Sequence, residues 1–220
     1  MFRLIENVLS TQQIAQLRDI AAKANFVDGK ISNPHSKVKS NLQIHDQNLQ
    51  QESVNIMAQA MFANEDFVNF AIPKHFAPPM ICRYTPGMKY GLHPDVAMMQ
   101  IGNVSVRSDL SATIFINDPE AYEGGHLRIV LGTEDIRIKG PAGSVVVYPS
   151  STLHEVEEVT EGERLVAITF IQSQVPDSFQ RELLYELGEV AALEGNQMDY
   201  ANYTRLQAVQ FNLRRMWSRG

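Results

Sequence analysis

The sequence predicts a mainly β fold flanked by helices. Between residues 80 and 173, short apolar runs alternate with turn signals such as Pro86-Gly87 and Gly140-Pro141. Short strands separated regularly by turns are typical of an all-β sandwich or barrel. The segments before and after this region show instead the three-to-four-residue apolar spacing of helices. We therefore expect one β unit between two helical regions.

Composition narrows the class of protein. The chain has 220 residues, of which 44% are hydrophobic and 20% charged, which is enough to bury a sizeable core. A net charge of −6 gives no support to a nucleic-acid surface. No apolar run approaches the roughly 20 residues of a membrane helix, and the N-terminus lacks the apolar stretch of a signal peptide. We expect a cytoplasmic protein that binds neither nucleic acid nor membrane.

Two helices are expected before the β unit. The first covers residues 10–24, where Ser10 and Gln13 have the spacing of a capping box and Leu17 lies on the apolar face. The second covers residues 50–63. Residues 26–30 suit a hairpin or loop, and the polar stretch 31–41 suits a loop. His35 and His45 lie in this polar region, and we expect both to be solvated rather than metal ligands.

The β unit is expected to begin at Met80. Its strands are predicted at residues 80–84, 110–116, 126–131, 134–139, 144–148, 154–159 and 164–172. Residues 96–108 have no clean period and suit a loop. Its Met98-Met99 pair could cover a site or belong to the core, and we favour the core.

The C-terminal part is predicted to be helical again. Asp177 can cap a first helix with Gln180 three residues on, and a second helix carries Leu206 and Leu213 on its apolar side. These helices could form a dimer interface or cover the barrel. We expect them to cover the barrel.

Three residues have the composition of a metal site. His93 and Asp95 are separated by one residue, so in an extended chain both side chains point to the same side. His154 could complete the set, giving the two imidazoles and one carboxylate of non-haem Fe(II) oxygenases. The short His-x-Asp pattern also fits a surface or turn pair, and His126 competes with His154 for the third position. The single cysteine, Cys82, excludes an internal disulfide and a cysteine-built zinc site.

Arg164 follows His154 by ten residues, with a Glu161-Gly162 turn between them. We therefore expect two adjacent strands, with Arg164 at the start of the second. Pro94, between the two candidate ligands, lacks an N–H and suits an edge or a bulge.

A longer set of motifs resembles a known family. The matching residues are Phe26-Val27-Asp28-Gly29, Arg83-Tyr84, Gly87, Tyr90-Gly91, His93-x-Asp95, Asp109-Leu110-Ser111-Ala112-Thr113, Gly124-Gly125, Pro141-Ala142-Gly143, Tyr148-Pro149-Ser150-Ser151, Leu153-His154, Arg164 and Ile171-Gln172-Ser173. Together they resemble the PKHD-type hydroxylases, which are Fe(II)- and 2-oxoglutarate-dependent dioxygenases related to prolyl 4-hydroxylases. The likeness covers most of the chain.

The resemblance implies a double-stranded β-helix core, a relative of the jelly roll. It implies that His93, Asp95 and His154 form the catalytic iron site and that Arg164 binds the distal carboxylate of 2-oxoglutarate. The planar guanidinium of arginine suits such a carboxylate. Tyr84 is expected beside it as a hydroxyl donor, although it could simply be an aromatic of the barrel wall.

The expected activity is hydroxylation of an unactivated C–H bond, with 2-oxoglutarate and O2 as cosubstrates and succinate and CO2 as products. Family analogy suggests a prolyl residue or a small molecule as substrate, and the sequence leaves open whether L-ascorbate (vitamin C) is needed to keep the iron reduced. The alternatives are a non-catalytic metal-binding β-barrel sensor and an interaction domain that docks a partner, including a second copy in a homodimer.

The same resemblance suggests three regions. Residues 1–78 form an N-terminal helical support, residues 79–174 the dioxygenase β-helix core, and residues 175–220 a C-terminal helical extension.

Overall fold

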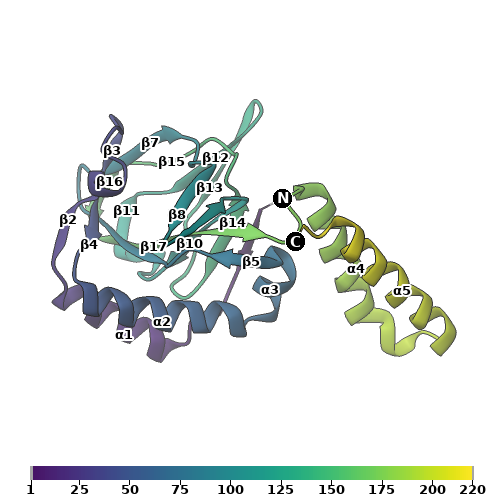
Figure 1. Ribbon diagram of the computed structural model, residues 1–220. Coiled ribbons are helices and arrows are strands. Elements are labelled where there is room, and N and C mark those ends of the chain that lie inside the picture. Colours follow the sequence, from purple (N-terminus) through teal and green to yellow (C-terminus); the bar gives the residue numbers. More distant parts are fainter. Residues whose placement is uncertain (1, 220) are drawn as a thin grey trace.

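Two antiparallel β-sheets pack against each other in the computed structural model, which describes residues 2–219 (Figure 1). The large sheet has, in spatial order, β1 (Arg3–Ile5), β14 (Val145–Pro149), β10 (Leu110–Phe115), β17 (Arg164–Ser173), β6 (Met80–Tyr84), β4 (Leu42–Ile44) and β2 (Phe26–Asp28), with β5 (Pro73–Phe76) also paired to β17. The small sheet has β13 (Glu134–Ile138), β12 (Leu127–Leu131), β15 (His154–Val156), β7 (Lys89–His93) and β3 (Lys39–Ser40). The predicted mainly β fold, with a double-stranded β-helix core and flanking helices, is confirmed.

The large sheet is buried on both faces, and strand β10 shows how. Leu110, Ala112 and Ile114 belong to the apolar cluster shared with the helices, whereas Phe115 belongs to the cluster between the sheets. All six residues of β10 are buried. A strand covered on both sides reads as a continuous apolar run rather than as an alternating one, which is why this segment is easy to recognise in the sequence.

Helices α1 (Thr11–Lys23) and α2 (Gln47–Ala63) lie along the outer face of the large sheet (Figure 1). The capping box expected at the start of α1 is present, because Ser10 and Gln13 exchange side-chain to backbone hydrogen bonds. Leu17 on α1 and Met57 on α2 are fully buried. A further short helix, α3 (Glu65–Ala71), follows α2 directly and was not expected.

The segment 96–108, expected to be a loop, is instead a β-hairpin. Strand β8 (Met98–Ile101) pairs with β9 (Val104–Arg107), and Gly102 at the turn has φ of +59°. Arg107 anchors its end through two hydrogen bonds to the Asp109 carboxylate, of 2.6 and 3.1 Å. The core assignment for Met98 is also wrong, because that side chain is 54% exposed.

The polar stretch 31–41 is likewise not all loop. Residues Gly29–Ser32 form a 3-10 turn after β2, and Lys39–Ser40 form β3. His35 and His45 are exposed, as expected. The remaining short strands, β11 (Tyr122–Gly124) and β16 (Val159–Gly162), pair with each other.

The C-terminal helices do not cover the barrel. Helices α4 (Ser178–Glu194) and α5 (Tyr200–Trp217) form a hairpin that projects away from the two sheets (Figure 1). At its base, Leu184 packs with Ile72 and Val175, and Trp217 packs against this cluster. Within the described part of the chain, no helix has the length and hydropathy needed to cross a membrane.

Candidate metal centre and cosubstrate pocket

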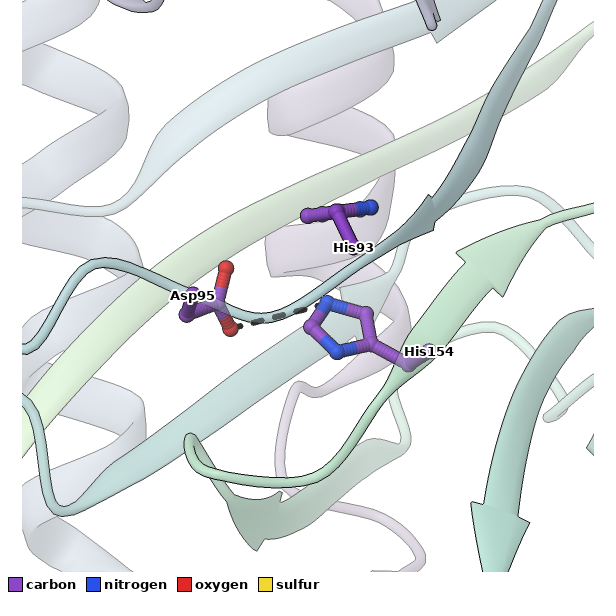
Figure 2. Close-up of side chains that lie close together, drawn as sticks. All are labelled: His93, Asp95 and His154. Atoms are coloured by element: carbon purple, nitrogen blue, oxygen red, sulfur yellow. Dashed lines mark ion pairs between the residues drawn. The ribbon is translucent and has the colours of Figure 1, made fainter.

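Three candidate ligands meet where strand β7 ends and strand β15 begins (Figure 2). His93 ends β7, His154 begins β15, and the two residues lie opposite each other in the antiparallel pairing of these strands. Asp95 follows two residues after His93. One ligand atom from each of the three residues lies within 4.8 Å of the others. The competing residue, His126, lies outside this group, with its Nδ1 3.3 Å from a carboxylate oxygen of Glu157.

Both imidazoles are held in the same tautomer. Nδ1 of His93 is 2.7 Å from the carbonyl oxygen of Gly91, and Nδ1 of His154 is 2.9 Å from that of Thr152. A carbonyl oxygen only accepts hydrogen bonds, so each Nδ1 carries the proton. Each Nε2 is left with a free lone pair, which is the form of histidine that binds a metal. Nε2 of His154 lies 3.5 Å from Oδ2 of Asp95.

Asp95 is oriented by two serines. Ser111 Oγ donates to Asp95 Oδ2 at 2.5 Å, and Ser150 Oγ lies 2.7 Å from Ser111 Oγ. Because Ser111 uses its proton on the carboxylate, Ser150 donates to Ser111. Pro94 lies just beyond the last residue of β7, where the strand needs no further N–H donor, and β7 carries a register shift between Tyr90 and His93. The expectation of an edge or bulge position for Pro94 agrees with this geometry.

Burial and the neighbouring imidazole favour the neutral form of His93. Burial, followed by the neighbouring His154, lowers the pKa of His93, so its ring is neutral at pH 7. Cys82 is buried on the adjacent sheet, and burial raises its pKa to about 11, which keeps the thiol protonated. A protonated thiol is a poor ligand, so the donors available to a metal are two imidazoles and one carboxylate.

Arg164 faces this site from the other sheet. It begins strand β17, as expected, but β17 pairs with β6 in the large sheet while His154 lies in the small one. The expectation that their strands are adjacent is therefore wrong. The side chain is only 1% exposed, and within residues 2–219 its Nε and Nη1 atoms have no hydrogen-bond partner. Tyr84 lies opposite in the strand pairing, with its ring 5.0 Å from the guanidinium carbon.

Gly125 makes room for Arg164. Its φ of +62° is a conformation that side chains disfavour, and a Cβ there would lie 3.0 Å from Cδ of Arg164 and 2.9 Å from Val159. The paired glycines of the sequence motif thus have a local cause, since Gly124 also has a positive φ, and a Cβ on it would clash with the backbone of Glu158.

Three buried polar residues, two of them in the same pocket, were missed in the sequence. Lys39, Asn41 and Gln43 are 4%, 3% and 1% exposed and alternate along β3 and β4. Lys39 and Asn41 line the pocket that also contains the three candidate ligands, Tyr84 and Arg164, with Thr113 and Phe170 in its wall. The spacing of two residues between them is typical of a strand and was the available signal, but the polar composition of the segment favoured a loop.

The donor set and the unsatisfied guanidinium fit an iron ion and a dicarboxylate cosubstrate, and comparisons with known proteins agree. Residues 79–172 match the model of the 2OG-Fe(II) oxygenase superfamily. A PKHD-type hydroxylase of Sphingopyxis alaskensis is 57% identical over all of both chains, and one of Stutzerimonas stutzeri is 38% identical over 99% of both. The chain belongs to the PKHD-type hydroxylases. It is therefore an oxidoreductase of the 2OG-Fe(II) oxygenase superfamily.

Solved structures agree on the fold of this hydroxylase. A Pseudomonas putida prolyl-4-hydroxylase superposes with a TM-score of 0.55 at 19% identity, covering 78% of this chain and 92% of that one. The 2-oxoglutarate-dependent epimerase SnoN of nogalamycin biosynthesis superposes with a TM-score of 0.58 at 14% identity, covering 79% and 77%. At these identities the likeness concerns the fold alone.

The space around Gly125 gives a matched test. Gly125→Ala and Gly102→Ala both place a side chain at a φ near +60°, but a Cβ on Gly102 meets nothing within 4 Å. We expect Gly102→Ala to cost about 1 kcal/mol of unfolding free energy, and Gly125→Ala about 1–3 kcal/mol more because Arg164 is displaced. Urea unfolding measures the loss of unfolding free energy in each variant. Calorimetric titration should show weaker 2-oxoglutarate binding only in Gly125→Ala, and equal affinities in the two variants would contradict this role.

Proposed function

We propose that His93, Asp95 and His154 hold Fe(II) and that Arg164 binds the distal carboxylate of 2-oxoglutarate. The observation that carries the proposal is the guanidinium of Arg164, which is buried with two nitrogen atoms unpartnered among the described residues. An isolated charge is costly to bury, and buried donors are nearly always satisfied. A carboxylate supplies both the opposite charge and the two acceptors that the guanidinium fork needs.

Tyr84 is proposed as the second donor to that carboxylate. Asn41 Nδ2 donates to the Tyr84 hydroxyl oxygen at 3.0 Å, which leaves the hydroxyl proton free for a ligand. Burial raises the pKa of Tyr84 well above its usual value, so the group remains a donor at any physiological pH.

Bound iron and 2-oxoglutarate would together activate O2 to hydroxylate an unactivated C–H bond. One oxygen atom would enter the product hydroxyl group, and the other would enter the succinate that forms with release of CO2. The residues of this chain position the reactants and exclude water. Gly91 and Thr152 fix the two imidazoles, and Ser111 fixes the carboxylate. Leu127 and Val156 form part of an apolar wall around the pocket.

The substrate, whether a prolyl residue or a small molecule, the use of ascorbate and the cytoplasmic location stay predictions. A non-catalytic metal sensor would leave the buried Arg164 without a role.

Replacing one candidate ligand should abolish turnover. We expect His154→Ala to lose iron binding and to lower 2-oxoglutarate consumption by at least about 100-fold. Replacing only a group that hydrogen-bonds to a metal ligand already lowers metal affinity or activity about 10- to 100-fold. The matched control is His126→Ala, which lies just before strand β12 of the same sheet and outside the cluster. Succinate release and iron content are measured for both. Normal turnover in His154→Ala, or its loss in His126→Ala, would show that the ligand assignment is wrong.

Replacing the buried arginine should separate cosubstrate binding from metal binding. In Arg164→Met we expect iron affinity to persist and the Kd of 2-oxoglutarate to rise by roughly 30-fold or more, since charge-assisted pairs of this kind contribute about 2–5 kcal/mol. Anaerobic titration measures the binding of both iron and 2-oxoglutarate, because a visible charge-transfer band requires iron and chelated 2-oxoglutarate together. Arg128→Met, on the outer face of the small sheet, is the control and should retain the band.

We further propose that the α4–α5 hairpin joins two copies of the chain. Helix α4 exposes a stripe at alternating spacings of four and three residues, made of Phe179, Leu183, Glu186, Val190 and Leu193. Helix α5 carries arginines and no acidic residue, whereas α4 exposes glutamates. Charge complementarity therefore favours packing of α4 on α5 of a second copy rather than on α4.

Replacing two exposed apolar residues of α4 by glutamate tests this self-association. We expect Leu183→Glu with Val190→Glu to convert a dimer into a monomer, measured by light scattering after gel filtration. The control is Leu131→Glu with Val104→Glu, two exposed apolar residues on the β unit, which should leave the mass unchanged. A monomeric unmodified protein would refute the proposal directly.

A further inference from the structure

Lys39 is a second buried cation beside the metal centre, and it has no acidic partner. The residue is 4% exposed, and no carboxylate oxygen of residues 2–219 lies within 4.0 Å of its Nζ. Nζ donates one hydrogen bond, of 2.8 Å, to Ser32 Oγ. That hydroxyl also accepts a 2.8 Å hydrogen bond from Gln43 Nε2, so it offers the ammonium group only a shared, neutral partner. Two of the three N–H bonds of Lys39 are left for another acceptor.

A cavity of about 290 Å³ adjoins Lys39, and neither Tyr84 nor Arg164 is among its described lining residues. This cavity lies next to the pocket of the metal centre, with which it shares Lys39, Tyr90, Asp95, Ile168 and Phe170. Its wall is mostly apolar, and among its described lining residues Lys39 is the one cation. The one anion is Asp95, which the proposed iron would neutralise. The volume is close to the lower limit of small-molecule sites.

The anions of the cosubstrate are already accounted for. In the proposed function, Arg164 takes the distal carboxylate of 2-oxoglutarate and the metal takes the other end. Lys39 therefore requires a third anionic group, and the adjoining cavity is where such a group can enter.

Building on the proposed function, we propose that this cavity receives the primary substrate and that Lys39 binds a carboxylate carried by that substrate on an apolar body. The ammonium would fix one end of the substrate while the apolar wall packs the rest. Lys39 is thus a specificity-determining residue, and the target C–H bond lies within a few bonds of an acidic group.

An isosteric pair of probes tests the charge requirement. Benzoate and benzamide have the same body and differ in charge, and each is titrated by ligand-observed NMR into the full chain with Zn²⁺ and saturating 2-oxoglutarate. We expect benzoate to bind about tenfold or more tighter than benzamide, as a hydrogen bond to a charged group contributes about 1.5–3 kcal/mol. Lys39→Met should abolish this preference, and Lys39→Arg should retain most of it. Lys37→Met, an exposed lysine of the same segment, is the matched control and should behave as the unmodified chain.

Three outcomes would overturn the proposal: equal affinity for the two probes, no measurable binding of benzoate, or a preference that survives in Lys39→Met. A loss of 2-oxoglutarate affinity in Lys39→Met, with the benzoate preference intact, would assign the residue to the cosubstrate instead. Folding is monitored by urea unfolding, and removal of an unpartnered buried charge should not lower stability. Failure of the proposed function is distinguishable, since it would appear as no 2-oxoglutarate-dependent charge-transfer band in the unmodified chain.

Discussion

The burial of one positive charge, that of Arg164, is the constraint on which the rest of the site depends. A guanidinium that is 1% exposed can be tolerated only where aromatic rings and hydrogen-bond acceptors surround it, and the proposed carboxylate would supply those acceptors. The large sheet places Tyr84 against it, and Gly125 leaves out a side chain to admit it. The proposed metal ligands lie on the opposite sheet. A dicarboxylate held between the two would therefore span the interior of the barrel, so the spacing of the sheets sets which cosubstrate fits.

Much of this could be predicted from the sequence, because the informative residues obey simple periods. His93 and Asp95 lie two apart near a strand end, and the apolar run at β10 marks a strand covered on both faces. The partner His154 could not be chosen over His126 from spacing, because their distances depend on strand pairing. The family resemblance selected it, and the pairing of β7 with β15 supports that choice.

The errors have physical causes too. Lys39 and Asn41 fall in the stretch predicted to be a loop, because sequence polarity does not distinguish a residue facing water from one facing a ligand pocket. Hairpin β8–β9 is only partly buried, through Val106, Met99 and Ile101, and its sequence shows no clean period, although Gly102-Asn103 between Ile101 and Val104 is a hairpin turn signal. For α4 and α5, an amphipathic pattern predicted that one face is covered but not by what, and each helix covers the other.

Because the α4–α5 hairpin is attached to the body at one end, the hairpin and the body are expected to unfold at different free energies. Its contacts with the body are concentrated at one end, where Leu184 and Trp217 pack near Ile72, and α5 contains no buried residue. Elements with few buried apolar contacts open at a lower free energy than the core does. Backbone amides far from the hairpin base would thus exchange with solvent through local opening, while those of β10 and β17 would wait for global unfolding. The hairpin can fray and re-form while the three candidate metal ligands stay together.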